Sequence, residues 1–114
     1  MIILDCETYP NYFLASFFNP ETNKTLSLEK FNDEPFDRKL LLKVMSDKLT
    51  GSFNGEGYDL LIIAFAIMGA SNAKLKELSD KIILSDDPAW MIARDNSIQI
   101  PPQWDHVDIM NVAQ

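Results

Sequence analysis

Two acidic residues, Asp5 and Glu7, stand one residue apart after the apolar run Met1–Leu4. Such a run predicts a buried strand that ends near the acids, and strand side chains alternate between two faces, so both carboxylates point to the same side. Neighbouring carboxylates repel one another unless a cation lies between them, and ligation by oxygen alone suits magnesium or manganese. The spacing predicts a metal-binding pair. A turn in which both acids are only solvated is the alternative.

The segment Phe53–Asp59 carries a third candidate acid, Asp59. It falls in the first turn of a predicted helix whose body, Leu60–Met68, is apolar on every side. The positive end of the helix dipole favours a carboxylate there, and a carboxylate that only caps the helix would occupy the same position. The combination of this acid with the earlier Asp-x-Glu pair favours a functional role.

The single histidine, His106, lies in the segment Trp104–Asp108. On a strand, His106 and Asp108 share one face, which would allow a ligand pair or a base with its acid. The alternative is that Asp108 caps a following helix. Asp105 is expected to be solvated.

The elements that must position these residues alternate between strand and helix patterns. Successive apolar residues predict that the first strand is central in a sheet and buried on both faces, and two more strands complete an antiparallel meander. Helices then cover a mixed sheet, which places the chain in the α/β class. In chain order, the expected elements are strands at Ile2–Cys6, Tyr12–Phe18 and Thr25–Phe31, a helix from Pro35 to about Leu49, a strand at Gly51–Asn54, helices at Tyr58–Met68, Asn72–Leu84 and Asp87–Asn96, and a strand at Trp104–Met110.

Composition limits the kinds of protein this chain can be. Its 114 residues, 46% of them hydrophobic, predict one domain over residues 1–114. The net charge of −7 argues against a DNA clamp with a broad basic face, but it is compatible with a metal-holding site. The lone Cys6 cannot form an internal disulfide, which favours a reducing, cytoplasmic setting. The longest apolar stretch, Leu60–Gly69, is about half the ~20 residues that a membrane span needs.

The two acidic motifs together resemble those of a known family. Asp5-Cys6-Glu7-Thr8 and Asn54-x-x-x-Tyr58-Asp59 resemble the first and second motifs of the DEDD family of 3′–5′ exonucleases, which have a ribonuclease-H-like fold. The resemblance is greatest to the proofreading exonuclease domains of bacteriophage DNA polymerases and their stand-alone relatives. It extends from Met1 to the segment Asp105–Asp108, and the family's element order agrees with the one predicted above.

The resemblance implies roles for individual residues. Asp5 and Glu7 would bind two Mg²⁺ or Mn²⁺ ions, and Asp59 would complete the cage around one of them, so that a water is activated and the leaving 3′ oxygen is stabilised. Asn54 and Tyr58 would place the terminal nucleotide of single-stranded DNA or of a DNA 3′ end. The alternatives are that Asn54 bonds the glycine-rich turn and that Tyr58 packs against the sheet. Cys6 would point the other way, into the core.

The chain also departs from the family. A complete DEDD enzyme has a fourth acid, preceded by a His or Tyr base, on a later helix, and no such segment appears before Gln114. We therefore expect a C-terminally truncated, incomplete module, completed by the remaining exonuclease or polymerase polypeptide and active in the cytoplasm of an infected bacterium if it is phage-derived. Lys74 and Lys76 would then be able to contact a phosphate backbone.

Two alternative functions do not require hydrolysis. The chain would in one case be an inactive remnant that binds another protein, with Trp90, Met91 and Trp104 as a candidate patch unless they pack in the core. In the other, it would be an acidic inhibitor that imitates nucleic acid. The residues that would matter for an inhibitor are Glu56, Asp86, Asp87 and Asp95.

Overall fold

The N-terminal strands form an antiparallel meander, as predicted. In the computed structural model, which describes residues 1–53 and 58–109, these strands are β1 (Ile2–Tyr9), β2 (Tyr12–Asn19) and β3 (Lys24–Phe31). A two-residue turn at Pro10 and Asn11 joins β1 to β2, and Tyr9 pairs directly with Tyr12. The strand β1 is longer than predicted because this hairpin continues its pairing past Cys6, so Asp5 and Glu7 lie inside the strand and not at its end.

The chain then crosses over the sheet to make parallel pairings. Asp37 caps α1 (Arg38–Asp47) by accepting a hydrogen bond from the Leu40 amide. The helix leads into β4 (Thr50–Ser52), which runs parallel to β1. The final strand, β5 (His106–Asp108), runs parallel to β4.

Three helices lie between β4 and β5. They are α2 (Tyr58–Ile67), α3 (Asn72–Leu84) and α4 (Ala89–Asp95). The apolar helix α2 is buried within the chain itself, because it contacts α1, α3 and β1. The bounds of α3 agree with the prediction, and both of its termini are hydrogen-bonded: the Ser71 side chain accepts from the Lys74 amide, and the Ser85 amide donates to the Lys81 carbonyl. None of the described helices is long and apolar enough to cross a membrane.

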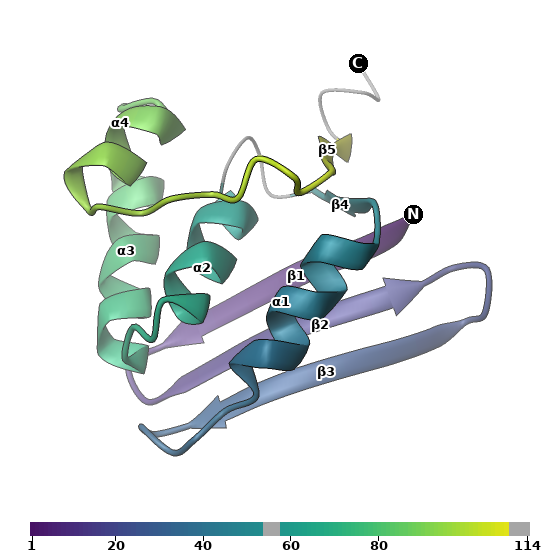
Figure 1. The fold of residues 1–114 in the computed structure, drawn as a ribbon. Helices are drawn as coiled ribbons and strands as arrows, with labels where there is room; N and C mark the ends of the chain where they lie inside the picture. Colours follow the sequence, from purple (N-terminus) through teal and green to yellow (C-terminus); the bar gives the residue numbers. More distant parts are fainter. Residues whose placement is uncertain (54–57, 110–114) are drawn as a thin grey trace.

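The result is a five-stranded mixed sheet with the order β3-β2-β1-β4-β5, which confirms the predicted α/β class and is consistent with a ribonuclease-H-like order. Figure 1 shows α1, α2 and α3 over one face of this sheet. No described element covers the opposite face, which we call the open face. The strand β1 is therefore central, as predicted, but the expectation that both of its faces are buried is wrong: Leu4 and Cys6 are buried, whereas Asp5 and Glu7 are exposed.

Candidate functional site

Asp5 and Glu7 project side by side from the open face of the sheet. They are alternate residues of β1, and on β2 they pair with Ser16 and Leu14. Both acids are exposed to solvent. The two-residue period of a strand predicted that both side chains point the same way, and the structure confirms it.

Beside these acids, residues of α2 and α3 lie next to the edge of β1. In the described part of the chain, β4 pairs with β1 only at Ile2 and Ile3. An open pocket of ≈ 420 Å³ lies beside the rest of this edge. Its lining residues come from β1, α2 and α3, and they are Asp5, Cys6, Glu7, Tyr58 and Ile83.

Asp59 lies on the other side of β1 from the acidic pair. Its side chain is only 1% exposed, and it is hydrogen-bonded by the thiol of Cys6, which points toward the helices. Burial raises the pKa of the Cys6 thiol well above its ordinary value, and the negative charges of Asp59 and Asp5 raise it further. Cys6 is thus a core residue, as predicted, and it lies between Asp59 and the open face.

This arrangement bears on the expected metal cage. Carboxylate oxygens are ligands that Mg²⁺ and Mn²⁺ accept, so the exposed pair Asp5 and Glu7 suits such an ion in chemistry. However, among residues 1–53 and 58–109 no three His, Cys, Asp or Glu side chains are arranged so that they could hold a metal ion. The described geometry therefore does not fit a cage made by Asp5, Glu7 and Asp59.

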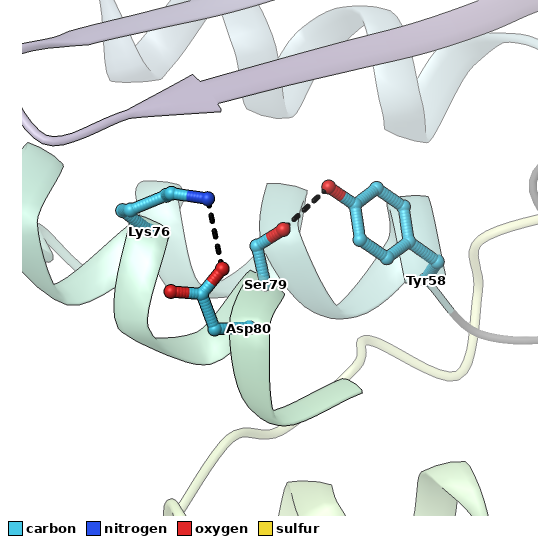
Figure 2. A network of polar contacts seen from close by, with 4 residues as sticks. All are labelled: Tyr58, Lys76, Ser79 and Asp80. Atoms are coloured by element: carbon cyan, nitrogen blue, oxygen red, sulfur yellow. Dashed lines mark hydrogen bonds and ion pairs between the residues drawn. The ribbon is translucent and has the colours of Figure 1, made fainter. Parts of the chain in front are cut away.

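Tyr58, from the motif Asn54-x-x-x-Tyr58-Asp59, lines the pocket. It is half-buried, and its hydroxyl lies 2.8 Å from the Ser79 hydroxyl of α3. Figure 2 shows this contact beside the ion pair between Lys76 and Asp80, in which Nζ and Oδ1 are 2.8 Å apart. Asn54 and Glu56, also named from the sequence, lie outside the described residues.

His106 joins β4 to β5. Its Nδ1 lies 2.8 Å from the Thr50 hydroxyl, and its Nε2 lies 3.0 Å from the Ser52 hydroxyl. Because the Thr50 hydroxyl donates to the Asp105 carbonyl, a consistent pattern has Nδ1–H donating to Thr50 while Nε2 accepts from Ser52.

These contacts bear on the expected role of His106 as a base. Burial lowers its pKa, and the negative charge of Asp108 partly opposes this effect. Both ring nitrogens are engaged with hydroxyls, so the described arrangement gives the ring a function in holding strands together. Asp108 is half-buried. The segment that it would cap in the alternative interpretation falls on residues 110–114, which lie outside the described residues.

The structure does not bring Trp90, Met91 and Trp104 together as the exposed patch that the sequence suggested. Trp104 is 8% exposed and belongs to the core, whereas Trp90 is 63% exposed on α4, with the Arg94 guanidinium 5.4 Å from its ring centre. A pocket of ≈ 490 Å³ lies nearby, between α3 and α4. Its lining includes the apolar residues Leu84 and Ile92, and its charged residues are mostly acidic: Glu77, Asp80, Asp87 and Asp95, with one lysine, Lys81.

Sequence reasoning did not identify Ile83 as a pocket residue. The only signal in the sequence was position: Ile83 lies four residues, about one helical turn, after Ser79 in α3. In the structure Ile83 is 66% exposed. Nothing in the sequence placed it opposite Asp5.

Comparisons of the chain with protein-family models, with curated proteins and with solved structures find no match. The family resemblance therefore depends on the two acidic motifs and on the order of the elements.

Proposed function

We propose that this chain is a module of a DEDD-type, metal-dependent 3′–5′ exonuclease whose site is completed by further ligands. One observation carries the proposal: Asp5 and Glu7, which share one face of β1, line an open pocket together with Tyr58. Strand β1 lies centrally in the sheet, so the pair is held on a rigid element, as catalytic carboxylates require.

The proposal assigns a limited task to the chain's own residues. Divalent ions, when bound, would supply an activated water and a charge opposite the leaving 3′ oxygen. Asp5 and Glu7 would provide two oxygen ligands, and Tyr58, with its hydroxyl bonded to Ser79, would offer its ring to a terminal nucleotide. Because Asp59 is directed to Cys6, the remaining ligands would come from residues beyond the described part or from another polypeptide.

Calorimetric titration with Mn²⁺ tests the proposal directly. We expect wild-type protein to bind Mn²⁺, and we expect Asp5→Asn and Glu7→Gln to lose most of this binding. Glu21→Gln, which removes an exposed carboxylate from the β2–β3 turn, is the matched control and should bind as wild type does. Equal binding by all four proteins, or none by wild type, would contradict the metal site.

Degradation of a labelled single strand on the same samples then tests activity. An incomplete module should bind Mn²⁺ without hydrolysing the strand. Hydrolysis that disappears in Asp5→Asn would show that the chain, or two copies of it, supplies a complete site. Loss of hydrolysis in the Glu21→Gln control would point instead to a general charge effect.

A second candidate function, protein binding, is favoured by the corner between α3 and α4. Leu84 is 84% exposed and Trp90 is 63% exposed there, and the pocket that Leu84 lines carries four carboxylates against one lysine. An exposed apolar anchor with acidic surroundings suits a basic amphipathic segment. Trp90 fluorescence during titration with a lysine-rich amphipathic peptide tests this function. Binding should weaken in Leu84→Ser, and an unchanged spectrum on addition of peptide would exclude it.

A further inference from the structure

Three aromatic side chains form a row across the open face of the sheet. Tyr9 of β1 pairs with Tyr12 of β2, and Tyr12 pairs with Phe31 of β3. The ring centres of Tyr9 and Tyr12 are 6.1 Å apart, and those of Tyr12 and Phe31 are 5.1 Å apart. The outer two rings are well exposed, Tyr9 by 49% and Phe31 by 55%. We call these three residues the aromatic row.

The middle ring of the row is held in place. The Tyr12 hydroxyl donates a hydrogen bond of 2.7 Å to Oε2 of Glu29. This bond, with lesser effects of burial and of the Glu29 and Glu7 charges, raises the pKa of Tyr12 to about 12. Tyr12 is therefore a neutral phenol at ordinary pH, and its ring is oriented before any ligand arrives.

The aromatic row is isolated on its face. The next position along the strands brings Glu7, Leu14 and Glu29 together, and the following one brings Asp5, Ser16 and Ser27 together. A helix that covered this face would bury those carboxylates, at a high cost in desolvation. The row is thus a narrow aromatic strip bordered by Leu14 and, on either side of it, the carboxylates of Glu7 and Glu29. Such a strip suits flat ligands better than a packed helix.

We propose that Tyr9, Tyr12 and Phe31 form a stacking platform for a base of single-stranded nucleic acid, next to the nucleotide held at Asp5 and Glu7. This inference depends on the proposed function. Aromatic rings bind bases by stacking without regard to sequence. Adjacent positions on one strand face are about 7 Å apart, so the aromatic row, Glu7 and Asp5 follow one another at a spacing that a nucleotide chain can span.

The test compares two strands of equal length, an oligothymidylate and an abasic deoxyribose-phosphate chain, by fluorescence anisotropy at low salt with Ca²⁺ as the divalent ion. The variants are Tyr9→Leu and Phe31→Leu, which keep apolar bulk but remove the ring. Phe18→Leu is the matched control, because Phe18 lies on the same face and pairs with Ile3 and Thr25 at the far end of the strands. Circular dichroism confirms that each variant is folded.

We expect wild type to prefer the oligothymidylate over the abasic strand by about tenfold, and each row variant to lose most of this preference. Phe18→Leu should retain it. If the row variants bind as Phe18→Leu does, or if both strands bind wild type equally, the platform is wrong and the exonuclease proposal still stands. If wild type binds Mn²⁺ but neither strand, the platform is also overturned. Failure to bind both Mn²⁺ and DNA would overturn the two proposals together.

Discussion

The two faces of β1 differ sharply in their exposure to solvent. Leu4 and Cys6 point toward the helices and are 1% and 6% exposed, whereas Asp5 and Glu7 point to the open face and are exposed to water. The other strands of the meander continue this division: Phe13 of β2 is fully buried and Phe31 of β3 is 55% exposed. The comparison teaches that stability resides on the helix side, while the groups able to bind a ligand are displayed on the other side at little structural cost.

The largest loss of stability should come from substituting a phenylalanine on the helix side of the sheet. Phe13 is 0% exposed and packs edge-on against Phe36, with ring centres 5.8 Å apart. Phe13→Ala should lower the free energy of unfolding by about 3–5 kcal/mol, because it removes buried apolar surface and leaves a cavity. Urea denaturation measures this loss.

The matched change on the open face is Phe31→Ala, which should cost less than about 1 kcal/mol because the ring is already largely in water. Similar losses in the two variants would break the division between the faces. They would indicate that another part of the protein covers Phe31 in solution.

Substitution of Gly69 tests how closely the end of α2 is packed against Arg38 of α1. Gly69 follows α2 with a φ of +100°, and a Cβ built on it would lie 2.5 Å from Nη1 of Arg38. That guanidinium also donates to the Ile67 carbonyl. Gly69→Ala should therefore cost about 1–3 kcal/mol through backbone strain and displacement of Arg38, as judged by the thermal unfolding midpoint. Met68→Ala, at an exposed neighbouring position, should change stability by less than about 1 kcal/mol.

The sequence was sufficient to predict those features that follow from the repeat of apolar and polar residues along a strand or a helix. The period of two placed Asp5 and Glu7 on one face, and the helical pattern predicted the bounds of α3. It was not sufficient for Asp59, because a helix that is apolar all round has no polar stripe to show how it is rotated about its axis. Only packing against β1 directs Asp59 to Cys6. The partners of His106 depend on the β4–β5 register, and no local pattern encodes such long-range pairing.

The contact between β4 and β5 should make a smaller contribution to stability, one that depends on pH. Burial lowers the pKa of His106 in the folded protein, whereas the unfolded chain titrates near about 6.5. As pH falls through that value, the unfolded state gains a proton that the folded state does not, so stability is lost. Urea midpoints at about pH 7.5 and about pH 5.5 should fall more for wild type than for His106→Asn, which lacks the titrating ring. Equal falls in both proteins would assign the pH dependence to carboxylates alone.

The smallest effect on stability should come from the acids of the open face. Asp5→Asn removes one of two neighbouring negative charges, and the exposed site makes no large packing contribution. In metal-free buffer the variant should therefore be as stable as wild type, or more stable by up to about 0.5 kcal/mol. With Mn²⁺ present, only wild type should gain stability, because a ligand that binds the folded state alone raises its free energy of unfolding. A large loss of stability without metal would mean that Asp5 belongs to the structural half of β1, and the contrast between the two faces would then apply only to Glu7.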